Sequence, residues 1–299
     1  MKDPQGLLRH KALFDDFARQ NPCPLSVYHF SSIFLWQDHF DFTFEVIDDH
    51  LCVWAKHSFG TFLYLPPLGK KLNARIVGQC FGRLRSTDSR PGVARIENVV
   101  EEELSVFDPA LYKPVKKSHE YYYVREDLVE LKGNAYKSKR SGYNQFVKNN
   151  RHECVAFDRR WTEDCLKLYD AWAQDRAQRS QDDIYKVMLE ENRGVHALLF
   201  HYFDELGLEG RVVLVDQKPQ AYTFGYPLNK DTFCVLVEVT NLDINGLSVY
   251  IFNKFCADNA LKNFKFINAM DDFAMDNVAK TKESFRPAFL IPSYTVTEK

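Results

Sequence analysis

The chain has 299 residues, 45% of them hydrophobic and 27% charged, which excludes a disordered chain and gives room for about two globular domains. A formal net charge of −2 excludes a whole-molecule field that would recruit nucleic acid or an anionic membrane, so such binding needs a local basic patch. Seven cysteines without a C-x-x-C pair argue against a disulfide scaffold or a zinc cluster and favour reduced, mostly buried thiols.

The N-terminal residues lack the apolar core of a signal peptide, and no apolar run approaches the roughly 18 residues of a membrane span. We therefore expect a cytoplasmic protein without a transmembrane segment. The sequence indicates no obligate protein partner.

The first half of the chain is predicted to form a three-strand meander followed by helix, strand, helix and strand. Strands are predicted where apolar and polar residues alternate between turns, and helices where apolar residues recur at helical spacing. The predicted elements are a helix at 7–20, strands at 42–47, 51–56 and 61–65, a helix at 71–85, a Gly/Pro/Ser-rich break at 86–92, a strand at 93–99, a helix at 101–107 and a strand at 121–125.

The second half repeats this layout after a group of leading helices, although the two halves share no evident residue-level identity. The predicted elements are helices at 162–178, 183–193 and 195–206, strands at 211–216, 220–227 and 232–240, a helix at 247–259, a strand at 264–268, a helix at 273–282 and a strand at 288–296. Antiparallel strands that lead into a strand–helix–strand crossover give mixed sheets with helices on their faces. We expect an α/β protein with an N-terminal lobe at 1–125, a basic connecting helix at 126–155 and a C-terminal lobe at 156–299.

Particular stretches carry a resemblance to a known family. They are Trp36-Gln37-Asp38, Leu65–Gly69 (LPPLG), Glu120–Leu128 (EYYYVREDL), Leu131–Arg140 (LKGNAYKSKR) and Lys282–Leu290 (KESFRPAFL). Together they resemble the uncharacterised proteins related to the C-terminal domain of phosphatidylglycerol lysyltransferases. The element order of the second half is also similar to the GCN5-related N-acetyltransferase fold.

This resemblance implies two tandem acyl-CoA N-acyltransferase-like lobes and transfer of an acyl or aminoacyl group. Characterised relatives move an amino acid from aminoacyl-tRNA to a lipid, and the Fem-type peptidoglycan aminoacyltransferases share the architecture. The donor is thus expected to be aminoacyl-tRNA or acyl-coenzyme A, and the acceptor a small molecule, lipid or peptide. Residues 241–248 stand where typical acetyltransferases have the Gly-rich loop that grips coenzyme A.

Glu238 lies inside the apolar segment Val237-Glu238-Val239 of a predicted central strand. Partial desolvation there would raise the pKa of the carboxyl, which suits a general base that accepts a proton from an attacking amine or hydroxyl. A Glu paired structurally with a cation explains the same position. Both interpretations stay open.

Two further groups are candidate substrate-binding residues. Asn245, Gly246 and Ser248 lie just before or within the first turn of a predicted helix, where free backbone N–H groups favour an anion such as a phosphate. Asp271 and Asp272 follow a predicted strand and can hold an ammonium group. An ordinary turn in the first case, and helix capping in the second, are the alternatives.

Basic residues complete the set of candidates. Lys282 matches a basic residue of the family's C-terminal motif, which implies a cation that neutralises a phosphate or an oxyanion; a solvated lysine at the end of a helix is the alternative. Lys137, Lys139 and Arg140 belong to the segment 132–151, which has no acidic residue and can bind tRNA phosphates or form a solvated helix face. The histidines have no metal-ligand spacing, so we expect no metal site. The function hypotheses are an acyl or aminoacyl transferase and, as the alternative, a catalytically silent ligand- or tRNA-binding protein with the same fold.

Overall fold

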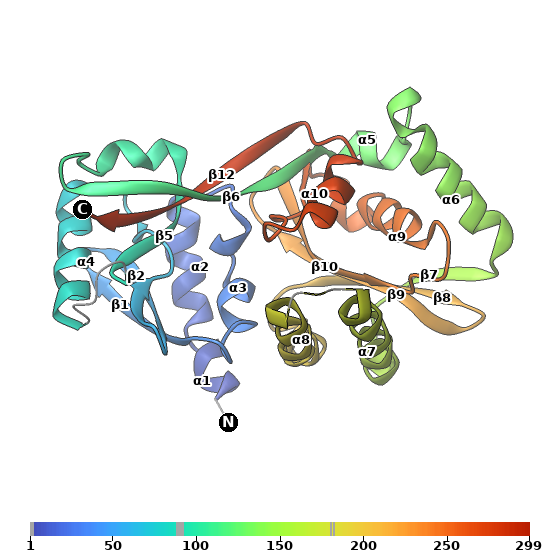
Figure 1. Ribbon diagram of the computed structural model, residues 1–299, viewed down its shortest axis with the longest axis horizontal. Helices are drawn as coiled ribbons and strands as arrows, with labels where there is room; N and C mark the ends of the chain where they lie inside the picture. Colours follow the sequence, from blue (N-terminus) through green and yellow to red (C-terminus); the bar gives the residue numbers. More distant parts are fainter. Residues whose placement is uncertain (1–2, 88–92, 180, 182) are drawn as a thin grey trace. The chain divides into compact units, whose positions relative to one another are not determined.

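The computed structural model describes residues 3–87, 93–179, 181 and 183–299 (Figure 1). The chain divides into two compact units. Unit 1 contains Met1–Tyr121, Met270–Val278 and Leu290–Lys299, and unit 2 contains Tyr122–Ala269 and Ala279–Phe289. Most of the predicted break at 86–92 lies outside the described residues.

Unit 1 is built around a mixed sheet with the strand order β1-β2-β3-β5-β12-β6, and β4 pairs with β2. The meander β1-β2-β3 is antiparallel, whereas β3 and β5 are parallel, so α4 is the helix of a crossover. The elements of this part of the chain are α1 (Pro4–Leu8), α2 (Lys11–Gln20), η1 (Ser26–Tyr28), α3 (Phe30–Phe34), β1 (Asp41–Ile47), β2 (His50–His57), β3 (Gly60–Leu63), β4 (Leu68–Gly69), α4 (Ala74–Thr87), β5 (Arg95–Val100), η2 (Glu101–Val106), β6 (Tyr112–Val124) and β12 (Phe289–Glu298).

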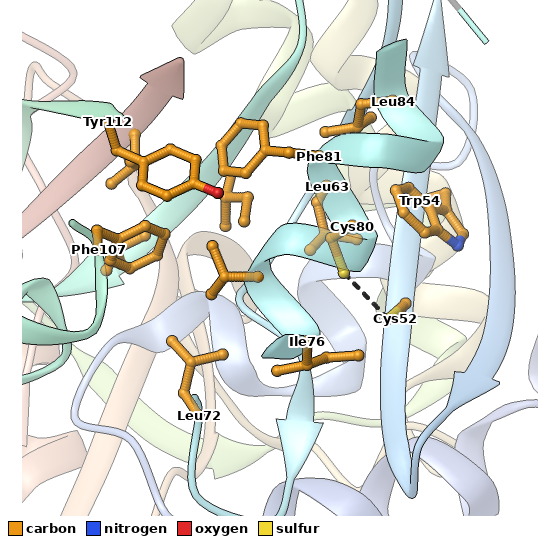
Figure 2. Close-up of a cluster of buried hydrophobic side chains, with 14 residues drawn as sticks. Cys52, Trp54, Leu63, Leu72, Ile76, Cys80, Phe81, Leu84, Phe107 and Tyr112 are labelled. Carbon is orange, nitrogen blue, oxygen red and sulfur yellow. Dashed lines mark hydrogen bonds between the residues drawn. The ribbon is translucent and has the colours of Figure 1, made fainter. Parts of the chain in front are cut away.

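The core of unit 1 lies between β2 and α4 (Figure 2). Residues at alternate positions of β2 point to the same face of the sheet, so Cys52 and Trp54 both pack on this side. α4 supplies a matching apolar face because its buried residues recur at helical spacing: Ile76, Val77, Cys80, Phe81 and Leu84. The thiols of Cys52 and Cys80 lie 3.7 Å apart in this core.

Unit 2 has a mixed sheet with the order β6-β11-β10-β9-β8-β7. β10 and β11 are parallel, and α9 connects them along the chain. The neighbouring pairs β10–β9, β9–β8 and β8–β7 are antiparallel. The elements are α5 (Arg125–Glu130), η3 (Asn134–Tyr136), α6 (Lys137–Asn149), β7 (His152–Ala156), η4 (Arg159–Trp161), α7 (Thr162–Arg179), α8 (Asp183–Tyr202), β8 (Glu209–Val215), β9 (Lys218–Pro227), β10 (Thr232–Thr240), α9 (Leu247–Cys256), η5 (Asn259–Leu261), β11 (Phe266–Asn268) and α10 (Asp276–Glu283), whose last residues belong to this unit.

Helices cover both faces of the unit 2 sheet: α7 and α8 lie on one side and α9 on the other (Figure 1). On β9, the Tyr222 hydroxyl lies 3.0 Å from Nδ1 of His196 on α8, whereas Ala221 packs with α9. Side chains alternate along a strand, so Thr223 shares the α9 face with Ala221. Glu238 is paired with Thr223 across the ladder and therefore also lies on the α9 face.

The expected fold class is confirmed: each unit is a mixed α/β layer structure with an antiparallel meander that leads into a parallel crossover. Several elements differ from the prediction. The helix at 7–20 is divided into α1 and α2, and the helices at 183–193 and 195–206 are one helix, α8. The segment 101–107 is a 3₁₀ helix, the last strand of the first half begins at Tyr112, and β7 was not predicted. The boundaries of the compact units differ from those of the predicted lobes, because residues 270–278 and 290–299 belong to unit 1.

Candidate active site

Glu238 lies in β10 just after an irregularity in its pairing with β9, between Val235 and Val237. Such a bulge bends and twists a strand locally and is frequent beside active sites. Oε2 of Glu238 is buried and has no hydrogen-bond partner among the residues that the structure describes. Loss of solvation raises the pKa of this carboxyl to about 8, and the positive charge of Lys139 offsets part of the increase. A buried carboxyl with an unpaired oxygen can accept a proton or a hydrogen bond from a ligand.

Lys139 extends from α6 toward the C-terminal part of unit 2. Its Nζ donates to Oγ of Ser284 at 2.6 Å and lies 3.7 Å from the centre of the Phe285 ring. Burial lowers the pKa of Lys139, and the charge of Arg286 lowers it further, while Glu238 opposes both. The Phe285 ring packs on Phe252 of α9, with the ring centres 4.9 Å apart. Glu238 lies on the α9 face of β10, so Lys139 and Glu238 both border α9.

The two other candidates for nucleic-acid binding on α6 have different environments. Nη1 of Arg140 donates to the carbonyls of Leu131 and Gly133, the latter at 2.7 Å, and so satisfies backbone groups beyond the end of α5. Lys137 is exposed to solvent. Within the part of the chain that the structure describes, Lys139 and Arg140 support the fold, and Lys137 alone of the three has no such role.

Lys282, near the end of α10, has a short contact with the backbone. Its Nζ donates to the carbonyl of Ala269 at 2.6 Å, directly after β11, and its own carbonyl accepts from the Tyr123 hydroxyl at 2.9 Å. These bonds connect α10 with β11 and β6. Lys282 therefore holds the segment that leads to Ser284 and Phe285, and a direct role in binding or catalysis stays a prediction.

The turn before α9 contains the three predicted anion-binding residues. Asn245 and Ser248 are exposed, and Gly246 has a left-handed φ of 80° at the N-cap. A Cβ at Gly246 would lie 2.1 Å from the carbonyl oxygen of Gly142 on α6. Gly246 is thus required by the close approach of α6, and the side chains available to a ligand at this turn are those of Asn245 and Ser248.

Asp271 and Asp272 belong to unit 1 by their contacts. Oδ2 of Asp272 accepts from the Tyr121 hydroxyl at 2.6 Å, and Oδ1 accepts from the Ala274 N–H at 3.0 Å, which forms a turn before α10. Burial and then the negative charges of Glu97 and Asp271 raise the pKa of Tyr64. Asp271 and Asp272 therefore contact residues of unit 1, whereas Glu238 lies among residues of unit 2.

The prediction did not include Ser284, Phe285 and Cys256, which all contribute to the environment of Glu238. Ser284 and Phe285 hold Lys139, and burial followed by the charge of Glu238 raises the pKa of the Cys256 thiol on α9. Ser284 and Phe285 lie in the segment that carries the family resemblance, so the motif was a signal for them. Cys256 lies in an apolar helix and has no such signal.

Both units have the same layout, in which an antiparallel meander leads through a helix to a parallel strand, and this defines a tandem acetyltransferase-like protein. The sequence profile described as phosphatidylglycerol lysyltransferase, C-terminal, matches residues 24–297. The chain therefore belongs to the family of the phosphatidylglycerol lysyltransferase C-terminal domain, as the sequence motifs predicted.

Solved structures show the same fold at low sequence identity. A conserved protein of unknown function from Bacteroides thetaiotaomicron is 23% identical, with a TM-score of 0.86 over 98% of this chain and 97% of that chain. L-PGS from Bacillus licheniformis is 12% identical, with a TM-score of 0.69 over 98% and 91%. FemX is 8% identical, with a TM-score of 0.63 over 99% and 96%. None of the curated proteins that were compared matches this sequence.

Among the residues that the structure describes, no helix combines the length and the apolar character that a membrane crossing requires.

Proposed function

We propose that the protein transfers an aminoacyl group from aminoacyl-tRNA to an amine or hydroxyl acceptor, with Glu238 as the general base. The observation that carries the proposal is the buried, unpaired Oε2 of Glu238, whose pKa is about 8. General bases work best when their pKa lies near the operating pH, and an ordinary exposed Glu would be too weak a base. Membership of the lysyltransferase-related family supports the reaction class.

The reaction needs a base and a correctly placed ester. The acceptor nitrogen or oxygen attacks the ester carbonyl of the donor, and the proton it loses passes to the Glu238 carboxylate. The tetrahedral intermediate collapses, the C–O bond to the ribose breaks, and Glu238 returns the proton to the ribose oxygen, which leaves as a hydroxyl. Direct transfer of this kind is accelerated by positioning and by stabilising the oxyanion, so it requires no covalent intermediate on the protein.

The packing of α6 supports aminoacyl-tRNA over acyl-coenzyme A as the donor. In the acetyltransferase fold, a pyrophosphate would approach the backbone of the turn before the crossover helix. Here the carbonyl of Gly142 lies against Gly246 at that turn. The exposed Lys137, Lys148 and Arg151 provide positive charge along α6 and just after it, where tRNA phosphates can bind.

The proposal defines the acceptor by its reactive group, an amine or a hydroxyl. A lipid, a peptide or a small molecule with an amine or hydroxyl satisfies the chemistry. A cytoplasmic location, where aminoacyl-tRNA is present, is proposed with it.

The test is a transfer assay with radiolabelled aminoacyl-tRNAs and acetyl-coenzyme A as alternative donors, and with pooled lipid, peptide and amine acceptors. We expect transfer from at least one aminoacyl-tRNA and none from acetyl-coenzyme A. Glu238→Gln should lower the rate by roughly 10²- to 10⁴-fold, while the exposed Glu153→Gln in β7 should leave it unchanged. Binding of aminoacyl-tRNA without any transfer would instead favour a catalytically silent binding protein.

A further inference from the structure

Lys139 has contacts that a solvated helix lysine does not have. Its ammonium group donates to Ser284 and lies over the face of Phe285, and the side chain is partly buried. Hydrogen bonding and a cation–π contact both hold the group in one place. The fold therefore fixes a positive charge inside unit 2, and this arrangement needs a physical reason.

The surroundings of Glu238 supply the reason. Oε2 of this carboxyl has no hydrogen-bond partner among the described residues. Burying an unpaired carboxylate is strongly unfavourable unless a nearby positive charge compensates. Lys139 lies over Phe285, which packs on α9, and Glu238 lies on the α9 face of β10, so this cation and the carboxyl border the same helix. The charge of Lys139 lowers the pKa of Glu238, and the charge of Glu238 raises the pKa of Lys139.

We propose that Lys139 is a positioning residue of the Glu238 site, held by Ser284 and Phe285 so that its charge keeps the buried carboxylate able to ionise. The inference deepens the proposed function, because a general base must be ionised before it can accept a proton. Without the cation, the pKa of Glu238 would lie still further above neutral, and a smaller fraction of the carboxyl would be ionised at the working pH.

Other charged and titratable groups face this site from the surrounding elements. Arg286 acts on Lys139 from the segment after α10. Cys256 faces Glu238 from α9, and Arg125 of α5 donates to the Cys256 carbonyl at 2.8 Å while its charge lowers the pKa of the thiol. Arginine side chains remain protonated in proteins, so the ionisation that matters at this site is that of Glu238.

The inference is tested without any substrate by following the side-chain carboxyl signal of Glu238 in ¹³C NMR as a function of pH. The signal is assigned as the one that is absent in Glu238→Gln. In Lys139→Met, which keeps the length of the side chain but removes its charge, the midpoint should rise by about one pH unit. Lys139→Arg should keep a midpoint close to that of the original protein, and the exposed Lys137→Met on the same helix should not move it.

An unchanged or lower midpoint in Lys139→Met would overturn the inference, provided that circular dichroism shows a folded protein. If Lys139→Met does not fold, Ser284→Ala removes the hydrogen bond to Nζ and should shift the midpoint upward by a smaller amount; no shift there would equally overturn it. The result is independent of turnover. A shifted midpoint together with full activity of Glu238→Gln would reject the proposed function and leave the charge coupling in place.

Discussion

At the scale of single residues, the carboxyl of Glu238 connects stability with pH. Its pKa is about 8 in the folded protein, against an ordinary value of 4.5. The folded state therefore binds more protons than the unfolded state between these values, and the free energy of unfolding falls as the pH rises through this range. Above pH 8 the folded protein contains the buried carboxylate at its full free-energy cost.

Glu238→Gln should remove this dependence. We expect the variant to gain stability relative to the original protein between pH 5 and pH 8, by on the order of a few kcal/mol at the upper end. Urea unfolding at a series of pH values measures the difference. Glu103, whose pKa burial raises to about 7, adds a slope of the same sign and remains in both proteins, so the difference between them isolates Glu238. Equal pH slopes would show that Glu238 is not desolvated.

The sequence predicted only part of the candidate site. Glu238 was predicted because a single carboxyl inside an apolar strand stands out, whereas no particular cation was predicted as its partner. Lys139 was assigned to a nucleic-acid surface because the neighbouring residues are basic, and a charge run does not show which side chain points inward. That direction depends on Ser284 and Phe285, which are more than 140 residues away along the chain.

At the scale of elements, two glycines meet where α6 approaches the turn before α9, and only one of them is required to be glycine. Gly246 has a positive φ, and an added Cβ would collide with the backbone of α6. Gly142 lies within a helix, and an added Cβ would meet its neighbours at 3.7 Å or more, which is an ordinary contact distance.

Gly246→Ala should therefore destabilise the protein by about 2–4 kcal/mol, since strain at positive φ adds to a collision that cannot relax without moving a helix. Gly142→Ala is the matched control and should change stability by less than about 1 kcal/mol, because alanine also favours the helix. Thermal unfolding of both variants gives the comparison. Similar melting temperatures for the two would argue against the close approach of α6 to the α9 turn.

Elements with clear periodicity were predicted well, and those with polar or continuous patterns were not. The central strands of unit 2 were found because their apolar runs lie between turn residues. The beginning of β6, Tyr112–His119, is mostly exposed and rich in lysine, so it lacked a strand pattern. The two predicted helices around Gly194 form one helix because a glycine inside a helix is unfavourable but tolerated when packing supports the helix.

At the scale of the whole molecule, the last strand returns to the first unit. β12 pairs with β5, and Val296 is fully buried in the core around α4. Local patterns do not show where a strand pairs, and the chain order favoured a C-terminal lobe that runs to residue 299. The predicted lobe boundaries depended on that order.

Val296→Ala should destabilise unit 1 by about 1–3 kcal/mol, because it leaves a cavity in a closely packed core. Leu290→Ala in the same strand is the control, since Leu290 is 45% exposed and its truncation should cost less than about 0.5 kcal/mol. Urea unfolding measures both. An equal effect at the two positions would contradict the placement of β12 in the unit 1 core.

The pH dependence of single-turnover aminoacyl transfer tests the proposed chemistry most directly. With a hydroxyl acceptor, which does not titrate in this range, the rate should rise with pH and level off above about pH 8, as Glu238 ionises. Glu238→Gln should be slower by roughly 10²- to 10⁴-fold and should lack this rise. A Glu238→Gln variant with the original rate and the original pH profile would contradict the assignment of Glu238 as the general base.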